Sequence, residues 1–217
     1  GFPRPALTRR ALRAPIACID RPRRAHAGPA RRLCAPAVRP SRQGHQGREV
    51  LAAGLVEPEA LVCHPGTHNK WTVLHQARIQ SFRTVMTGEL FSLLKEHSIL
   101  ADLLALPVEP GDAFEAGVRH GLEMDDLQAE LFSVRARVLL GKAAREDAAS
   151  YTSGLLIGGD LRIGLGSATT QPVMVMARPE LTRLYAAALA AAGRKAVELD
   201  GEQCFLSGIK HIAERIQ

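Results

Sequence analysis

A short turn between two predicted strands carries residue types that bind phosphate. Gly66, Thr67, His68 and Lys70 lie within five consecutive positions. A glycine turn frees backbone N–H groups that can surround an anion, the Thr67 hydroxyl can donate to a phosphate oxygen, and the Lys70 ammonium can neutralise its charge. The same residues also suit an ordinary hairpin in which Lys70 is solvated and His68 only hydrogen-bonds the turn. The pattern predicts a phosphate-binding turn, with the plain hairpin as its alternative.

A second candidate lies where a predicted strand passes into a helix, at Thr87, Gly88 and Glu89. Backbone donors at a helix N-terminus favour an anionic ligand, so these residues could face one. The alternative is a simply capped helix, in which Glu89 is stabilised by the helix dipole.

Small residues interrupt an apolar helical segment at positions 153, 154, 158 and 159. Small side chains let another group approach closely, and that group is either a neighbouring helix or the flat base of a nucleotide. The pattern alone leaves both open.

Several enzyme classes are excluded by the motifs that the chain lacks. The histidines form no H-x-x-x-H or H-x-H set with a nearby carboxylate, so no metal site of protein ligands is expected. No G-x-S-x-G elbow, Walker A loop or G-x-G-x-x-G after a strand is present. These absences argue against acyl hydrolases and dinucleotide oxidoreductases.

Hydrophobic periodicity predicts the elements that position these residues. A three-stranded meander is followed by helices and then by a β-α-β-α order, which predicts an α/β domain with helices against a mixed sheet. The predicted strands are 60–64, 70–74, 78–86, 172–176 and 196–199. The predicted helices are the end of one at 49–55, then 87–104 with Thr87 as N-cap, 112–122, 125–140, 147–161, 180–192 ended by Gly193, and 201–215.

Residues 1–48 differ in kind from the rest of the chain. They carry 12 Arg and a single acid, Asp20, for a net charge of +11, whereas residues 49–217 carry a net charge of −5. Seven prolines argue against regular structure in this leader. We interpret it as out-of-frame translation of a GC-rich gene, with a transit peptide and a disordered basic arm as alternatives. The basic pI therefore does not indicate a folded nucleic-acid-binding surface.

The remaining 169 residues suffice for one sizeable core, and no apolar run approaches the roughly 18 residues of a membrane span. The four cysteines lie far apart with no C-x-x-C pair. We therefore expect a soluble domain in a reducing, cytoplasmic setting.

Residues 49–217 resemble the 2-dehydro-3-deoxygalactonokinase family. The similarity is carried by the segments P-G-T-H-N-K-W (65–71), F-R-T-V-M-T-G-E-L (82–90), D-A-F-E-A-G (112–117), L-F-S-V-R (131–135) and S-G-L-L-I-G (153–158), with Leu181, Thr182, Tyr185, Gly208 and Ile209 further on.

The resemblance implies a lobe with the ribonuclease H-like topology of the actin-like sugar kinases. It implies an enzyme that transfers the γ-phosphoryl group of ATP, with Mg²⁺ on the phosphates, to the 6-hydroxyl of 2-dehydro-3-deoxy-galactonate in galactonate catabolism. Three groups of residues gain implied roles. Gly66, Thr67 and Lys70, with His68 beside them, would hold the β- and γ-phosphates; Thr87, Gly88 and Glu89 would line the cleft; and Gly154, Ala177 and Pro179 would border the adenosine.

The chain also departs from the family pattern. It contains no Asp-x-Gly-Thr-like phosphate turn, and residues 43–49 read Q-G-H-Q-G-R-E where an acidic Gly-Glu-Glu-like segment is expected. We therefore expect no general base here and interpret residues 49–217 as the C-terminal lobe of such a kinase, with the isolated chain inactive.

Two other functions stay open. One is a kinase for another sugar acid, and the other is a non-catalytic interaction or ligand-sensing module whose basic arm binds anions without specificity. We expect no specific nucleic acid and no membrane as partners, and self-association through an exposed lobe face.

Overall fold

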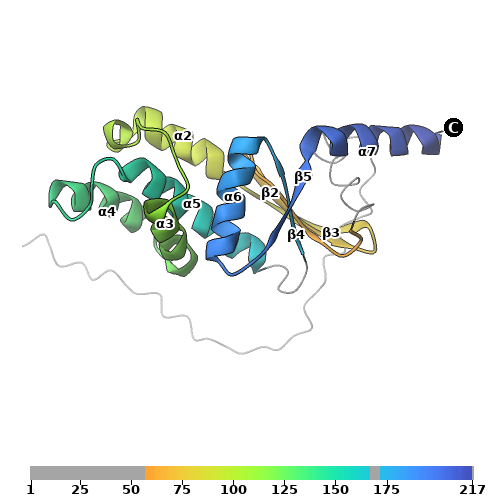
Figure 1. The fold of residues 1–217 in the computed structure, drawn as a ribbon, viewed down its shortest axis with the longest axis horizontal. Helices are drawn as coiled ribbons and strands as arrows, with labels where there is room; N and C mark the ends of the chain where they lie inside the picture. Colours follow the sequence, from red (N-terminus) through yellow and green to blue (C-terminus); the bar gives the residue numbers. More distant parts are fainter. Residues whose placement is uncertain (1–56, 167–171, 217) are drawn as a thin grey trace, which may run out of the picture. The chain divides into compact units, whose positions relative to one another are not determined.

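The computed structural model describes residues 57–166 and 172–216, which form a five-stranded mixed sheet with helices (Figure 1). The predicted leader 1–48, its boundary with residue 49 and the helix end at 49–55 lie outside the described residues. Within the described part of the chain, no helix is both long enough and apolar enough to cross a membrane.

The sheet has the strand order β3-β2-β1-β4-β5, in which β1 pairs antiparallel with β2 and parallel with β4. The predicted antiparallel meander and the mixed sheet are both confirmed. The strands are β1 (Leu61–His64), β2 (Asn69–His75), β3 (Arg78–Val85), β4 (Val173–Ala177) and β5 (Ala196–Asp200).

The helices follow the predicted order, with boundaries shifted by a few residues. The predicted helix 87–104 is shorter, because it stops at His97 and is followed by a separate 3-10 turn. The elements are α2 (Thr87–His97), η1 (Ala101–Leu103), α3 (Asp112–Glu123), α4 (Leu127–Leu139), α5 (Ala148–Leu165), α6 (Pro179–Ala191) and α7 (Gly201–Ile216).

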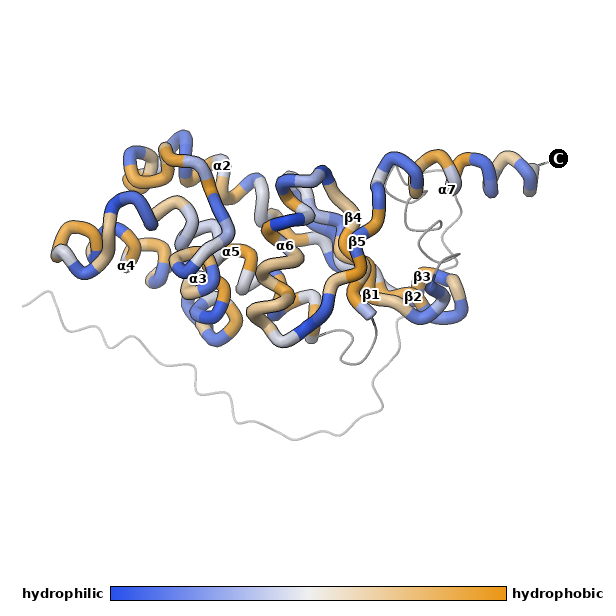
Figure 2. The backbone as a smooth tube through the Cα atoms, viewed as in Figure 1, coloured by the Kyte–Doolittle hydropathy of each residue, from blue (hydrophilic) through white to orange (hydrophobic). Residues whose placement is uncertain are grey.

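Strands β1 and β4 are buried on both faces, which explains their continuous apolar sequences. Leu61, Cys63 and the β4 valines pack against α3, α5 and α6. Val62 and the β4 methionines pack on the opposite face, where Cys204 of α7 joins them. In Figure 2 these strands carry the colour of hydrophobic residues, whereas hydrophobic and hydrophilic residues alternate along α7.

Helices α3 and α5 lie side by side because glycines remove the side chains between them (Figure 1). A Cβ on Gly117 would lie 2.2 Å from the Tyr151 carbonyl oxygen, and one on Gly158 would lie 2.3 Å from that of Val118. Of the two predicted explanations for the small residues in α5, the structure shows the neighbouring helix.

The predicted N-cap of α2 is wrong by one residue. The N-cap is Met86 and Thr87 begins the helix, with no side-chain hydrogen bond at the cap. The Glu89 N–H instead donates to the carbonyl oxygen of Thr67 at 3.0 Å. A backbone group from a distant turn therefore satisfies a donor that sequence reasoning assigned to a local side chain.

Candidate functional site

The turn between β1 and β2 lies directly against the first turn of α2. Besides the Glu89 hydrogen bond, the turn approaches Gly88 so closely that a Cβ there would lie 2.3 Å from the Gly66 carbonyl oxygen. The His68 Nε2 and Glu89 Oε2 atoms are also in contact, with both side chains partly exposed. The structure thus brings Gly66, Thr67 and His68, which were predicted for phosphate, beside Gly88 and Glu89, which were predicted for the cleft.

Buried polar side chains form hydrogen bonds that fix the turn between β1 and β2. The Asn69 Oδ1 atom accepts a hydrogen bond from the Gly66 N–H at 2.7 Å, and the Asn69 Nδ2 atom donates to Asp160 and to the Tyr185 hydroxyl. Asp160, from α5, also accepts from Trp71 Nε1 at 2.8 Å and from the Tyr185 hydroxyl at 2.6 Å. The Gly66 N–H therefore already has a partner within the protein.

Burial raises the pKa of Asp160 above its ordinary value, and the hydrogen bonds from Tyr185, Trp71 and Asn69 oppose part of that rise. Burial also raises the pKa of Tyr185 well above its ordinary value, with Asp160 adding to the effect. The Tyr185 hydroxyl is therefore neutral and acts as a hydrogen-bonding group.

Two pockets meet at this turn. A pocket of about 1010 Å³ lies at the carboxyl ends of the parallel strands β1, β4 and β5, where α6 and α7 begin. A smaller pocket of about 280 Å³ lies among the turn, α2, α5 and α6. Both are lined by Gly66, Thr67, Arg178 and Leu181. Open α/β sheets commonly bind ligands at the carboxyl ends of their parallel strands.

The structure brings together most, but not all, of the predicted site residues. Ala177 and Pro179, which were predicted to border the adenosine, line the larger pocket, and Gly154 does not lie with them. Gly154 faces α3, where its Cβ would lie 2.1 Å from the Phe114 carbonyl oxygen. Its observed role is helix packing, which accounts for the glycine without a ligand.

Lys70 also lies apart from its predicted neighbours. Side chains alternate between the two faces of a strand. Asn69 contacts Asp160 on the α5 side of β2, so Lys70 is placed on the opposite face, where its cross-strand partner is His64. Lys70 lines neither of the two pockets described above.

Sequence reasoning missed Arg178, Asn69 and Asp160. Arg178 is exposed, lies between Ala177 and Pro179 at the start of α6, and lines both pockets. A cation placed between a strand and a helix that begins with proline was a usable signal. Asp160 gave a different signal, because it is a single carboxylate in an otherwise apolar helical segment.

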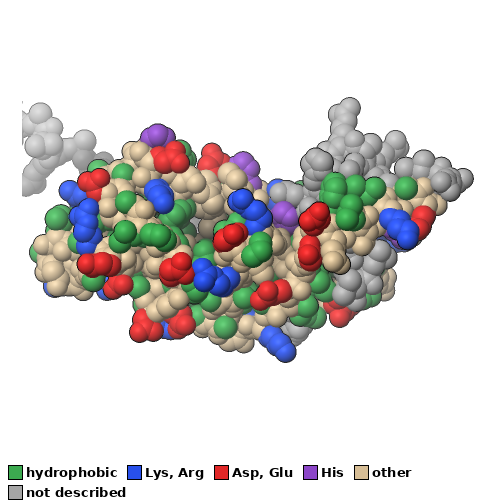
Figure 3. Space-filling view, turned by 45° about the horizontal axis from the view of Figure 1, so that its top comes forward, with side chains coloured by type: hydrophobic (Ala, Val, Ile, Leu, Met, Phe, Trp, Pro, Cys, Tyr) green, Lys and Arg blue, Asp and Glu red, His purple; other side chains and the backbone are tan. Residues whose placement is uncertain are grey.

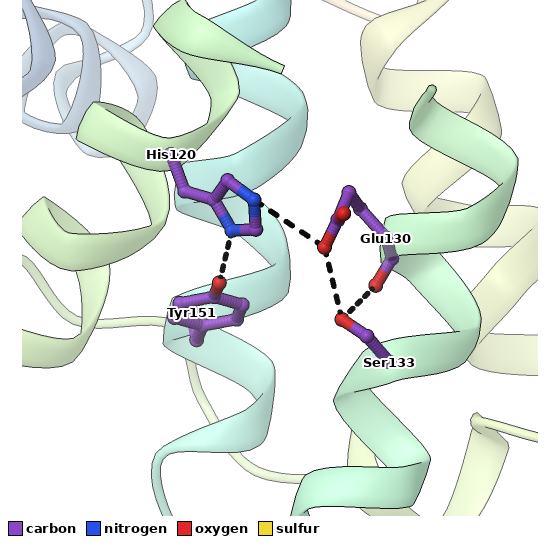
Figure 4. Close-up of polar contacts among 4 residues, drawn as sticks. All are labelled: His120, Glu130, Ser133 and Tyr151. Atoms are coloured by element: carbon purple, nitrogen blue, oxygen red, sulfur yellow. Dashed lines mark hydrogen bonds and ion pairs between the residues drawn. The ribbon is translucent and has the colours of Figure 1, made fainter. Parts of the chain in front are cut away.

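A separate polar cluster joins α3, α4 and α5 (Figure 4). His120 lies 2.6 Å through Nδ1 from the Tyr151 hydroxyl and 3.3 Å through Nε2 from Glu130, which also accepts from the Ser133 hydroxyl. The Arg137 guanidinium lies over the Tyr151 ring, 5.1 Å from its centroid. Each of these polar groups is paired within the cluster, so the arrangement links the three helices.

On the face drawn in Figure 3, acidic and basic side chains are interspersed.

Comparison with known proteins gives the same family from sequence and from structure. The model of the family described as 2-keto-3-deoxy-galactonokinase matches residues 31–212. The 2-dehydro-3-deoxygalactonokinase of Escherichia coli (strain K12) is 36% identical over 169 residues, which cover 77% of this chain and 58% of that protein. A protein of Rhizobium meliloti (strain 1021), named as a probable 2-dehydro-3-deoxygalactonokinase, is 36% identical over 174 residues, or 76% of this chain and 56% of that protein.

A crystal structure described as a 2-dehydro-3-deoxygalactonokinase protein from Sinorhizobium meliloti superposes with a TM-score of 0.73 at 33% identity, covering 79% of this chain and 59% of that one. The chain thus spans less than two thirds of the length of these relatives. The family match covers most of the sequence, including both pockets and the turn between them, and this chain belongs to the 2-keto-3-deoxy-galactonokinase family.

Proposed function

We propose that this chain carries the nucleotide-binding side of an ATP-dependent sugar-acid kinase. The observation that supports the proposal most directly is the meeting of a large and a small pocket at Gly66, Thr67 and Arg178. Phosphoryl transfer requires a nucleotide and an acceptor hydroxyl to meet in line at the γ-phosphorus, and its catalysis is mainly positioning and charge stabilisation. Two pockets that share one turn and one arginine suit that requirement.

The larger pocket is proposed to hold ATP. Its volume suits a nucleotide, and the helix N-terminus at Pro179 supplies a favourable dipole for phosphate. Ala177 and Pro179 would border the adenosine. Mg²⁺ would be held largely through the phosphates, as this ion commonly is. Bound there, the metal would neutralise charge on the transferred group.

The smaller pocket is proposed to hold the sugar acid, with the 6-hydroxyl of 2-dehydro-3-deoxy-galactonate facing the shared turn. Thr87, Ser92 and Ser153 line this pocket, and the exposed Ser92 offers a hydroxyl group to a polyhydroxylated ligand. In the transfer, the substrate oxygen forms a bond to the γ-phosphorus and gives up its proton to water, the bond from that phosphorus to the β–γ bridging oxygen breaks, and ADP leaves.

Arg178 is proposed to stabilise the charge on the transferred phosphoryl group, because it reaches both pockets and is permanently charged. The exposed Thr67 hydroxyl would donate to a phosphate oxygen, with His68 beside it. Gly66 would shape the turn, since its N–H is bound to Asn69. Lys70, on the other face of β2, would act at longer range. Among the described residues that line the smaller pocket there is no Asp or Glu, so the general base stays unassigned.

At the level of the fold, we propose that residues 49–217 form a C-terminal lobe of the ribonuclease H-like, actin-like kind. The strand order β3-β2-β1-β4-β5, with an antiparallel meander and parallel β4 and β5, supports this assignment.

Binding and turnover by the 217-residue chain test the proposal. Calorimetry should detect Mg-ATP binding that weakens at least tenfold in Arg178→Ala and is unchanged in Arg119→Ala, a control whose side chain pairs with Glu115 away from both pockets. ADP release with 2-dehydro-3-deoxy-galactonate, compared with ordinary kinase turnover of about 1–100 per second, then shows whether the chain completes the reaction. A folded sample that neither binds Mg-ATP nor releases ADP would contradict the nucleotide assignment.

A further inference from the structure

We infer that Asp160 is a positioning residue that sets the backbone of the 65–68 turn through Asn69. This inference rests on the proposed function only for its consequence, which is that the turn is held ready for phosphate. The structural link itself is independent of any ligand.

Asp160 is 1% exposed and lies on α5, whereas the turn lies between β1 and β2. An ionised carboxylate can only accept hydrogen bonds, so the Asn69 group facing it must be the NH₂. That orientation turns the Asn69 oxygen toward the Gly66 N–H, which it binds at 2.7 Å. The chemistry at Asp160 thus decides which end of the Asn69 amide reaches the turn.

The other hydrogen-bond partners of Asp160 also donate to it. Trp71 Nε1 can only donate, and it binds Oδ1 at 2.8 Å. The Tyr185 hydroxyl donates to Oδ2 at 2.6 Å and accepts from Asn69. Donors therefore surround the carboxylate from β2 and α6.

A charged group in this position is costly, because burial destabilises its ionised form. Burial raises the pKa of Asp160, and the hydrogen bonds counter only part of the rise. Core packing would be served by an apolar residue, since the flanking positions of α5 are buried and apolar or glycine. The hydrogen bonds to Asn69 and Trp71 supply a reason for the carboxylate that packing does not.

The substitution Asp160→Asn should reverse the Asn69 amide. Trp71 Nε1 can only donate, so the new side chain keeps its oxygen at the Oδ1 position and places its NH₂ at the Oδ2 position, where this donor faces the donor of Asn69. If Asn69 turns its oxygen toward position 160, its NH₂ faces the Gly66 N–H and that hydrogen bond is lost. Tyr185→Phe is the control, because it removes a hydrogen-bond partner of both Asp160 and Asn69 but leaves the link from Asp160 through Asn69 to Gly66 in place.

The first measurement is the solvent-exchange rate of the Gly66 amide proton by NMR in the full chain. Asp160→Asn should raise the rate about threefold to tenfold, as expected for loss of one hydrogen bond, and Tyr185→Phe should change it less than twofold. Asn69→Ala should match Asp160→Asn, and the double variant should add little to either single change. The indole resonance of Trp71, the single tryptophan, reports whether the site around residue 160 stays packed.

The second measurement is the affinity for Mg-ADP by calorimetry, which should fall about threefold to tenfold in Asp160→Asn and in Asn69→Ala. A Gly66 exchange rate that stays at the parent value in a folded Asp160→Asn variant would overturn the inference. If Asp160→Asn does not fold, Asn69→Ala decides: unchanged exchange at Gly66 would overturn the link. If exchange rises in the variants but the parent chain binds no Mg-ADP, the positioning role stands and the proposed function fails.

Discussion

Replacing Gly88 by alanine tests how closely the turn is packed against α2. The new Cβ would lie 2.3 Å from the Gly66 carbonyl oxygen and 3.0 Å from both the Gly66 carbonyl carbon and the Thr67 Cα. The first distance is roughly 1 Å shorter than an ordinary van der Waals contact. The obstacles are backbone atoms, so no side-chain rotation relieves the overlap and either the turn or the helix must move.

The expected cost follows from two opposing effects. Forcing an extra methyl group into a close-packed site costs about 1–3 kcal/mol. Alanine recovers up to about 1 kcal/mol, because it is the better residue within a helix. We therefore expect Gly88→Ala to lower the free energy of unfolding by about 1–2 kcal/mol, or the melting temperature by about 2–8 °C for a domain of this size.

Urea and thermal unfolding of the purified chain measure this change. Gly66→Ala is the control, because its Cβ would meet nothing within 4 Å although it lies on the other side of the same contact. Equal stability of Gly88→Ala and the parent, with Gly66→Ala also unchanged, would refute the close approach of turn and helix.

Further changes test other parts of the structure. Gly121→Ala should lower the free energy of unfolding by about 1–3 kcal/mol, because its Cβ would lie 2.2 Å from an α5 carbonyl oxygen, whereas Gly111→Ala, with open space around it, should not; urea unfolding compares them. Burial and the nearby charge of Asp160 raise the pKa of the Cys63 thiol well above its ordinary value, so iodoacetamide at pH 8 should label it only after unfolding, as peptide mass spectrometry would show. His68→Ala should change the free energy of unfolding by less than about 1 kcal/mol, because the contact with Glu89 that it removes is exposed; a larger change in urea unfolding would show that this contact fixes the turn. The raised pKa of Asp160 means that the folded protein binds this proton more tightly than the unfolded chain. As pH rises from below 3.8 through the raised pKa, the free energy of unfolding of the parent should therefore fall relative to that of Asp160→Asn. A difference between the two proteins that does not change with pH in urea unfolding would contradict this.

The linear sequence was sufficient for the order and type of the elements. Apolar runs at 60–64 and 172–176 predicted strands because β1 and β4 are buried on both faces. Three- and four-residue spacing predicted helices such as α3, which buries one side. The segments around 65–71 and 82–90 also carried the family resemblance, which the comparisons confirm.

Only the tertiary structure decided how the candidate site is put together. Thr67 and Glu89 lie 22 positions apart, and their hydrogen bond replaces the side-chain cap that local rules predict. Asn69 and Asp160 are 91 positions apart, so no local pattern links the carboxylate to the turn. The small residue Gly154 permits another group to approach closely, but the sequence does not specify which group. In the structure that group is the helix α3. Local sequence determines conformation through short-range sterics and periodicity, whereas contacts between distant residues depend on how the elements pack.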